Sequence, residues 1–584
     1  MPQARSPSST APPAHTRRAL VLLCRLLAVL YALMAAAAML WLSPRVPYAD
    51  TWHFDTQLLA QPFPGNVLMV DNGHAQLLPR LLRWLELRQW HGNQWPTIIA
   101  GMLFLAASLW LWITTDAETA QTADRTRHRL VRAAWLLTGV AGLCWLGNGR
   151  TLAHGNEAIH SYLIIACLLA ALRLVAKPGG IRLTAALALA VVASLSFGTG
   201  AAVFAAIAVA LILRHARWPE LLVTVAGAAL AAGLYLLLPK AVGGTGVIVL
   251  QPILQLTQLA RWLGSPWLVA GGPLVDASVL DKLPAVTQPL AAPLAHLSTA
   301  LFGPARTAIW PELGLGLAGI ALLITLTWQL WRQPQRYHAA AAMALGCSWF
   351  ALVCGVLVVL ARTDAFLQYP DQVYATRYAV WYTLFWCGLL GAALWRLHAA
   401  GHSGRALVLA LAIAIGLLPA TGWNGFRAVH MSRIAARDAL GVRVGVIDRN
   451  GDHGENWIHI MQRARPLLLA HGTSIFAPSR GPLVGAQLDP ATPAWPLRKL
   501  AWQPVDNALR GAGARTRFML QGANGYRVLL VNADWRIIGE ARPAPGQGRW
   551  QGWALGSAPP AKLRGVTLDD AIAHTIDTPG ASAQ

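Results

Sequence analysis

The segment YADTWHFD, residues 48–55, combines two carboxylates and a histidine with three aromatic residues, in a chain that has only 25 Asp and Glu. One carboxylate here could act as a general base on an acceptor hydroxyl or as a metal ligand. Asp50 and Asp55 are five positions apart, so on a helix they point in different directions and do not form a paired acid/base dyad. We take Asp50 as the candidate catalytic residue and Asp55 as a candidate substrate-binding residue. The alternative is a solvated loop with incidental acidic residues.

A second polar stretch, DNGHAQLLPRLL at 71–82, follows closely and contains Asn72, His74 and Arg80. One interpretation is structural: DNGH starts a helix with Asp71 or Asn72 as its N-cap, and Arg80 extends toward a membrane surface. In the other interpretation, the histidine and the arginine clamp a phosphate-bearing ligand, which suits the fork of a guanidinium group. We therefore include Asn72, His74 and Arg80 among the candidate substrate-binding residues.

The stretch GNGRTLAHGNEAIH, residues 147–160, is short but rich in ionisable groups. A turn requires glycine and asparagine, but it does not require an arginine, a glutamate and two histidines. We predict that Arg150 and Glu157 contact the substrate, with Glu157 as a second acid. His154 and His160 could join Glu157 in ligating a divalent cation, although this spacing is not specific for a metal. No other cofactor is indicated.

A further polar stretch, ARTDAFLQYPDQVYATRYAVWY at 361–382, mixes cations with tyrosines. Tyrosines are ordinary at a membrane interface, so alone they carry little information. Arg362 and Arg377 lie at the ends of apolar segments, where they suit contact with a phosphate or a diphosphate. We predict Arg362, Tyr374 and Arg377 as substrate-binding residues.

Several protein classes are disfavoured by motifs that the chain lacks. It has no P-loop, no HExxH, no GxSxG and no GxGxxG followed by an acidic residue, so an ATPase, a zinc protease and a serine hydrolase are not indicated. The apolar segments contain no row of Asp, Glu or Lys of the kind that a proton-coupled transporter uses. The net charge of +22 comes from Lys and Arg that mark membrane orientation, so we do not predict nucleic-acid binding.

The composition indicates that membrane helices position these residues. Of the 584 residues, 55% are hydrophobic and 12% are charged, with a mean hydropathy of +0.45. Apolar blocks long enough to span a bilayer alternate with polar breaks, which predicts an all-α polytopic membrane protein with about 11 transmembrane helices. The six cysteines lie inside or beside these blocks, so no disulfide framework is indicated. We place the spans at 19–43, 96–115, 133–148, 159–175, 183–197, 199–213, 220–238, 311–331, 339–361, 378–396 and 406–422.

The loop charges predict the orientation of these spans. Alternate loops are rich in arginine, as in 125–132 and 173–182, whereas the intervening short loops have far fewer cations. The excess of Lys and Arg in cytoplasmic loops therefore places the N-terminus in the cytoplasm, and an odd number of spans places the C-terminus outside. We interpret the first span, 19–43, as an uncleaved anchor because its apolar run is too long for a signal peptide.

The same pattern divides the chain into regions. Residues 1–18 are predicted to be a disordered cytoplasmic tail, and 19–422 form the transmembrane domain, with outer loops at 44–95 and 239–310. Residues 254–267 suit helices that lie in the membrane interface. Residues 423–584 are predicted to be a small α+β extracytoplasmic domain, with helices followed by a β-meander. Its aromatic residues could stack on sugars or form a packing core; these are Tyr526, Trp535, Trp550 and Trp553.

Four short motifs carry a resemblance to a known family: ADTWHF, GHAQLLPRLL, SFGTGAAVF and ATRYAVWY. With the cytoplasmic first span, the acidic residue directly after it and the C-terminal outer domain, the chain resembles the GT-C superfamily of polytopic membrane glycosyltransferases, in a bacterial branch. The second motif departs from that branch, because Gly73 stands where an acid is usual and Ala75 where an arginine is usual. His74 and the Pro79–Arg80 pair match.

The resemblance implies a transferase that moves a sugar from a polyprenyl-phosphate donor to a glycan, lipid or protein acceptor outside the bacterial cytoplasmic (inner) membrane. It implies Asp50 as the base that deprotonates the acceptor, with Arg377 and Arg362 holding the carrier phosphate. Membrane lipids are the remaining partners. Three alternatives remain open: an O-antigen polymerase or ligase, a non-catalytic transporter of lipid-linked glycans, and a structural membrane protein.

Overall fold

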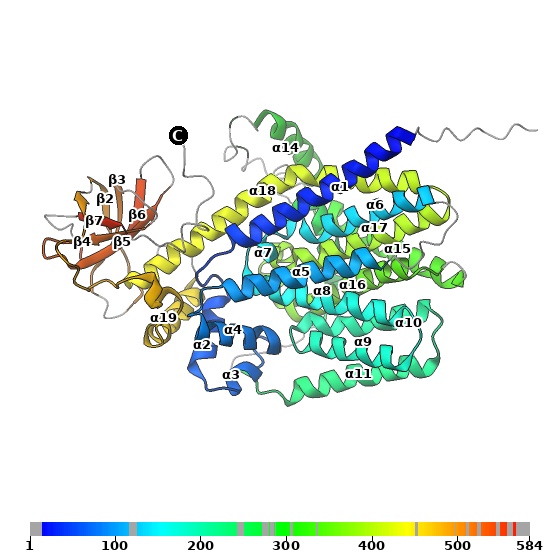
Figure 1. Cartoon of the computed structure of the whole chain (residues 1–584), viewed down its shortest axis with the longest axis horizontal. Coiled ribbons are helices and arrows are strands. Elements are labelled where there is room, and N and C mark those ends of the chain that lie inside the picture. Colours follow the sequence, from blue (N-terminus) through cyan, green and yellow to red (C-terminus); the bar gives the residue numbers. More distant parts are fainter. Residues whose placement is uncertain are drawn as a thin grey trace, which may run out of the picture.

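The computed structural model of the chain is mostly helical, with a small antiparallel sheet near the C-terminus (Figure 1). A bundle of long helices runs roughly side by side, and the sheet lies beyond one end of it. We call this end of the bundle the sheet end and the opposite end the far end. The structure describes residues 14–115, 125–241, 250–270, 280, 285, 288–303, 308–334, 337–449, 454–496, 498–509, 513–521, 527–544, 549–557 and 564–567.

Nine helical segments in these ranges are long and apolar enough to cross a membrane, and two shorter apolar helices lie with them. The nine contain α1 (Ala14–Ala37), α5 (Trp95–Thr114), α6 (Arg125–Cys144), α8 (Gly155–Val175), α11 (Trp218–Leu237), α15 (Trp310–Arg332), α16 (Ala339–Gln368), α17 (Ala379–Ala399) and α18 (Ser403–Val444). The shorter pair is α9 (Gly180–Ser194) and α10 (Ala202–Leu213). Each of the eleven predicted segments coincides with one of these helices, so the sequence located the helices correctly.

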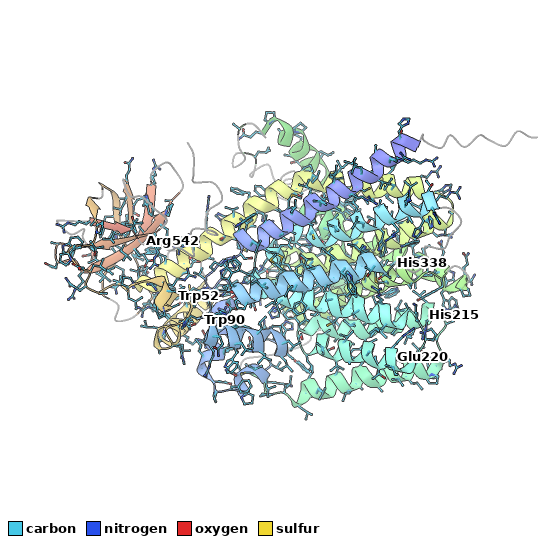
Figure 2. All side chains as sticks on the ribbon, viewed as in Figure 1. Trp52, Trp90, His215, Glu220, His338 and Arg542 are labelled. Carbon is cyan, nitrogen blue, oxygen red and sulfur yellow. The ribbon has the colours of Figure 1, made fainter. Side chains whose placement is uncertain are left out.

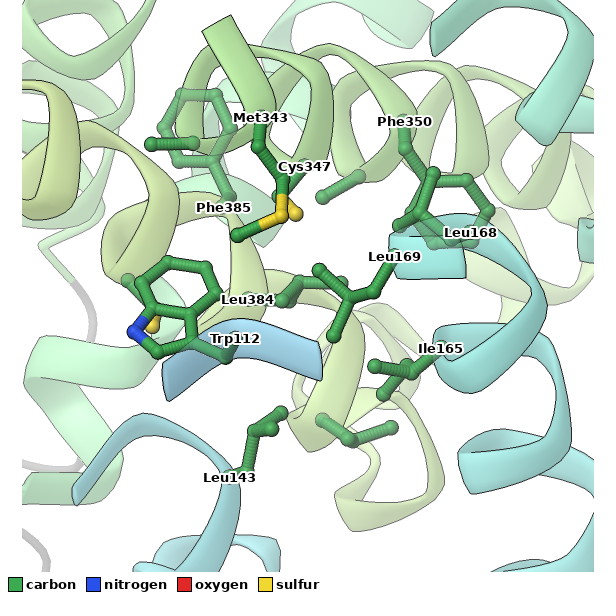
Figure 3. Packing of buried hydrophobic residues seen from close by; sticks show 14 of the residues in the cluster. Trp112, Leu143, Ile165, Leu168, Leu169, Met343, Cys347, Phe350, Leu384 and Phe385 are labelled. Atoms are coloured by element: carbon green, nitrogen blue, oxygen red, sulfur yellow. The ribbon is translucent and has the colours of Figure 1, made fainter. Parts of the chain in front are cut away.

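The centre of the bundle is built from α5, α6, α8, α16 and α17, whose apolar side chains interdigitate (Figure 3). The indole rings of Trp112 and Trp135 stack with centroids 4.1 Å apart, and each ring N–H donates to the backbone carbonyl of the other residue. Gly139 lies under Trp112, where an added Cβ would come within 2.3 Å of the ring. Small residues at helix contacts let the backbones approach, which is how helices associate in lipid.

Two helices between α11 and α15 belong to the predicted loop 239–310: α12 (Pro252–Ala270) and α14 (Gln288–Phe302). The segment 254–267, predicted to lie in the interface, instead packs along α15 and against α16 and α17. Its backbone meets α15 closely, because an added Cβ at Gly316 would lie 1.8 Å from the Ala260 carbonyl oxygen. A buried ion pair between Arg261 and Glu312, with an N–O distance of 3.3 Å, joins the same two helices. The charge of Arg261 lowers the mean hydropathy of α12, although α12 packs within the bundle.

The predicted loop 44–95 folds over the sheet end as three helices, α2 (Thr51–Ala60), α3 (Gly65–Leu68) and α4 (Leu77–Gln89). The amphipathic helix predicted at 74–90 corresponds to α4. α2 packs against α19 (Glu455–Ala470), so the first loop and the C-terminal region meet. Figure 2 places Trp52 of α2 at this junction.

The last membrane segment does not stop at residue 422: α18 continues to Val444, and its 42 residues extend past the bundle toward the sheet (Figure 1). The sheet has the strand order β1-β7-β4-β5-β6-β3-β2, so β4, β5 and β6 form the predicted meander while β3 returns to pair with β6. Trp550 and Trp553 are buried, Trp535 is half-buried, and Tyr526 lies outside the described residues. The strands are β1 (Trp495–Pro496), β2 (Arg498–Pro504), β3 (Arg515–Gln521), β4 (Val528–Val531), β5 (Ile537–Pro543), β6 (Arg549–Leu555) and β7 (Arg564–Thr567).

Candidate functional site

Several of the predicted residues lie within electrostatic range of one another, on the first loop, α7 (Gly149–Leu152), the start of α8 and the last part of α16. Asp50 connects them, because its charge acts on Tyr48, His74, Arg150 and His154. Glu157 and Asp438 also act on Tyr48, and Arg362 acts on His74. We call this set the Asp50 cluster; its members are Tyr48, Asp50, His74, Arg150, His154, Glu157, Arg362 and Asp438.

Asp50 itself is exposed at the start of α2. It occupies the N-cap position, but its side chain does not hydrogen-bond to the first turn of the helix. Among the described residues, its carboxylate forms no hydrogen bond and no ion pair, although Arg150 lies within electrostatic range. An exposed carboxylate that the fold does not use is free to accept a proton or a hydrogen bond from a ligand.

Arg150 and Glu157 form an ion pair beside Asp50. The Arg150 guanidinium donates to Glu157 Oε1 from Nη2 at 3.0 Å and from Nε at 3.2 Å. Both side chains are mostly but not completely buried, at 19% and 17% exposure. Glu157 lies in the first turn of α8, where a helix dipole favours a carboxylate. Arg150 thus stays positioned, with its charge largely balanced by Glu157, next to the unpaired Asp50.

His154 links this pair to the first loop. Its Nε2 lies 3.1 Å from the Thr51 hydroxyl, and its ring meets Tyr48 edge-on with centroids 5.5 Å apart. Burial, with a contribution from Arg150, lowers the pKa of His154 to about 3. Burial likewise raises the pKa of Tyr48. Both rings are therefore neutral near pH 7, and the ionic chemistry of the cluster belongs to Asp50, Arg150, Glu157 and Arg362.

His74 and Arg362 lie within electrostatic range of each other. The His74 ring stacks on Phe197 with centroids 4.4 Å apart. The close approach of Gly198 makes this possible, since a Cβ there would lie 2.5 Å from His74 Nδ1. Burial, and next to it the charge of Arg362, lowers the pKa of His74 to about 4. Phe197 and Gly198 of the SFGTG segment thus make room for the imidazole ring of His74.

Arg362 marks a kink in α16. Its backbone angles, φ −125° and ψ 15°, are non-helical inside an otherwise continuous helix. The side chain is half-buried and, within the described part of the chain, forms no hydrogen bond or ion pair. A guanidinium group without a protein partner at the end of a membrane helix is the type of group that binds a phosphate.

Arg377 lies near the Asp50 cluster, but its guanidinium group already contacts other residues of the protein. It is carried by the 3₁₀ turn η9 (Thr376–Tyr378), which packs against α7, the helix of Arg150. Its Nη2 donates to Gln372 Oε1 at 3.3 Å, and its guanidinium lies over the Tyr378 ring. Tyr374 is directed elsewhere: its hydroxyl joins Glu312 and Arg261 in the contact between α12 and α15. The structure therefore separates Tyr374 from the Asp50 cluster.

Asp55, predicted as a substrate contact, has a structural role in the first loop. Its side chain is fully buried, and both carboxylate oxygens accept hydrogen bonds from Arg83. No oxygen is left to face a ligand.

Arg80 is also fully buried, with its guanidinium against Gln57 and over the Phe54 ring. Burial lowers the pKa of Arg80 to about 10. It supports the first loop from inside and does not reach the solvent, although the sequence predicted a substrate contact. Asn72 is exposed in the turn before α4, with a positive φ of 48°.

The predicted divalent cation has no matching site in the part of the chain that the structure describes, where no group of three or more His, Cys, Asp or Glu could hold a metal. The sequence did not indicate a role for Asp438 or Tyr48 at this site. Asp438 reaches the cluster from α18, nearly 400 positions along the chain, and no local sequence signal marks it.

No family model matches the chain, and no match was found among the curated proteins or the solved structures.

Proposed function

We propose that this protein is a membrane glycosyltransferase that moves a sugar from a polyprenyl-phosphate donor to a cell-envelope acceptor at the sheet end of the bundle. The observation that carries the proposal is Asp50: an exposed, unpaired carboxylate that lies beside Arg150 and His74, where membrane helices end. A base and cations at a membrane surface are what transfer from a lipid-borne phosphate requires.

The reaction can be written with this set of residues. The Asp50 carboxylate takes the proton of an acceptor hydroxyl, and the acceptor oxygen attacks the anomeric carbon of the donor sugar. The bond from that carbon to the phosphate oxygen breaks, and the electron pair leaves with the lipid phosphate. Arg362, which has no protein partner in the described chain, stabilises the negative charge that develops there. Arg150 orients Asp50 through its charge, and Glu157 holds Arg150 in place.

A groove for the carrier lipid supports the same proposal. A cavity of about 230 Å³ lies between α6, α12, α17 and α18, and its lining is almost entirely apolar, including Trp145, Trp267 and Trp386. Trp145 precedes Arg150 by five residues, so a short stretch of chain joins the lining of this cavity to the Asp50 cluster. Apolar surface next to polar, catalytic groups is the arrangement that a lipid-linked substrate needs.

The proposal includes an orientation. The sheet end faces the outside of a bacterial cytoplasmic membrane and the basic far end faces the cytoplasm, as the loop charges favour. The acceptor then reaches the Asp50 cluster from the aqueous side, between the first loop and the C-terminal region, which pack together through α2 and α19.

The test uses the purified full-length protein and a panel of polyprenyl-phosphate and polyprenyl-diphosphate monosaccharides. Release of the free polyprenyl phosphate is followed by mass spectrometry in the presence of envelope glycans. We expect Asp50→Asn to lower the release rate at least about 100-fold, the range for loss of a general base, and donor binding to persist.

The control is Asp371→Asn, which removes an exposed carboxylate at the same end of the bundle and should leave the rate unchanged. Equal rates for Asp50→Asn and the wild-type protein would rule out Asp50 as the base. Failure to release polyprenyl phosphate from any donor, by a protein that elutes as a single folded species, would reject the transferase.

A further inference from the structure

A second cavity lies at the far end of the bundle, away from the Asp50 cluster, and nothing in the proposed function uses it. It has a volume of about 280 Å³ and lies between α15, α16 and α17. His338, at the start of α16, lines it, and Figure 2 shows this residue at the end opposite the sheet. All three helices belong to candidate membrane spans, so the cavity lies at one end of these spans.

Two hydrogen-bond donors on residues that line the cavity are unused. The Tyr337 hydroxyl and the Trp395 indole N–H are both buried, and neither has a hydrogen-bond partner among the described residues. Trp395 is 5% exposed, and the His338 ring stacks on it with centroids 3.8 Å apart. Buried donors without a partner cost free energy unless something accepts from them. A ligand that offers acceptor atoms next to these two residues would therefore be stabilised.

The charge of the lining favours an anion. Arg396 lies at the edge of the cavity with an exposed side chain that forms no hydrogen bond or ion pair in the described chain. The charge of Arg214 also acts on Tyr337 from the neighbouring loop. The lining residues that the structure describes include no aspartate or glutamate. A cation, two neutral donors and no carboxylate match the oxygens of a phosphate group.

The rest of the lining combines three polar residues, Gln329, Gln333 and His398, with apolar residues of the three helices. The apolar ones are Leu326 and Leu330 of α15, Ala341 and Leu345 of α16, and Ala392 and Ala399 of α17. A free phosphate would leave these side chains uncovered, whereas an acyl chain would cover them. The cavity thus has the polarity of a phospholipid: a charged group at the membrane surface and a hydrocarbon chain below it.

We propose that this cavity binds one anionic phospholipid, with its phosphate beside Arg396 and its acyl chain between α15 and α16. The phosphate oxygens accept hydrogen bonds from the Tyr337 hydroxyl and the Trp395 indole N–H. The rest of the headgroup, beyond this phosphate, remains in the water near Arg214. Basic pockets between membrane helices bind anionic headgroups by the same combination of charge and burial.

The test is a lipid titration of the full-length protein in detergent, followed by native mass spectrometry. The probes are phosphatidylglycerol and phosphatidylcholine with the same acyl chains. We expect one phosphatidylglycerol molecule to remain bound per protein and to bind about tenfold more tightly than phosphatidylcholine, as one charge-assisted phosphate contact provides. Equal binding of the two lipids would overturn the proposal.

Substitutions locate that site. Arg396→Gln should weaken phosphatidylglycerol binding about tenfold, and Tyr337→Phe, which removes only a hydroxyl group, about threefold. The matched control is Arg405→Gln, an exposed arginine on the next helix that does not line the cavity, and it should change nothing. If Arg405→Gln and Arg396→Gln weaken binding equally, the contact is a general surface charge and the proposal is wrong.

A competition separates a lipid site from a phosphate site. Glycerol phosphate carries the headgroup phosphate without a chain, so it should not displace phosphatidylglycerol at concentrations near that of the lipid. Displacement at equal concentration would show that the apolar part of the cavity contributes nothing, which contradicts the proposed acyl-chain contact.

Discussion

Arg83 donates two hydrogen bonds to the carboxylate of Asp55, each 2.8 Å long, and both side chains are almost completely buried. The same guanidinium lies 2.7 Å from Glu86, and Glu86 accepts from the Thr97 hydroxyl at 2.8 Å. This network joins α2 to α4 and to the start of α5. The first loop, which carries Asp50, is therefore fixed to a membrane helix by buried charges.

We expect Arg83→Met to destabilise the protein by about 3–5 kcal/mol, because it leaves two buried carboxylates without their cation. The measurement is thermal unfolding of the purified protein in detergent, followed by tryptophan fluorescence. Arg88→Met is the control: Arg88 is exposed one turn further along α4 and forms only a ring contact with Trp84. Similar midpoints for the two variants would contradict a stabilising role for the buried network.

The neutral histidine at the Asp50 cluster predicts how stability depends on pH. Burial lowers the pKa of His154 from 6.5 to about 3 in the folded protein. The unfolded chain therefore binds a proton first as the pH falls, so stability decreases between pH 6.5 and about 3, by at most about 1.4 kcal/mol per pH unit from this group. Above pH 6.5 this contribution is constant.

The measurement compares unfolding midpoints of the wild-type protein and His154→Gln at pH 7.5, 6.0 and 4.5. The wild-type midpoint should fall more steeply than that of the variant, since glutamine does not titrate. Parallel curves for the two proteins would show that His154 is not the group responsible. His459, which is exposed on α19, provides the matched His→Gln control, and its substitution should leave the slope unchanged.

The sequence predicted the membrane helices well because a bilayer imposes a length and an apolar composition on each span. It did not reveal where one helix serves two surroundings. α18 continues for about six turns beyond the predicted span, so the last span and the helix predicted after residue 422 are one continuous element. Its polar second half packs on the first loop and the sheet. For α12, the sequence did not predict the close packing along α15, in which Arg261 pairs with Glu312.

Choosing polar residues at the ends of apolar blocks located several members of the Asp50 cluster, since polar groups near a membrane are costly to keep without a use. The same rule could not separate Asp50 from Asp55. That distinction depends on Arg83, which lies 28 positions from Asp55 and has no sequence signature as its partner. Pairing of β3 with β6 also escaped prediction, because it joins strands that are not neighbours along the chain.

Orientation can be measured directly, since the first loop and the C-terminal region occupy the same end of the bundle. We expect alkaline phosphatase fused after residue 584 to be active in a bacterial host, because this reporter folds only outside the cytoplasm. A fusion after Lys177, in a basic loop, should be inactive. An active fusion at Lys177 together with an inactive C-terminal fusion would invert the proposed orientation, and it would place the Asp50 cluster on the cytoplasmic side.

Arg362 and Arg377 allow the phosphate-binding step to be tested with a matched pair. The sequence favoured both arginines, but Arg377 donates to Gln372 whereas Arg362 forms no hydrogen bond in the described chain and acts on His74. Arg362→Gln should therefore weaken retention of a polyprenyl phosphate at least about tenfold, the value of one charge-assisted contact. Arg377→Gln should weaken it less.

Retention is measured by native mass spectrometry with added polyprenyl phosphate, and Asp50→Asn should leave it unchanged because a base does not hold the carrier. A larger loss for Arg377→Gln than for Arg362→Gln would move the phosphate site from the kink in α16 to the turn that precedes α17.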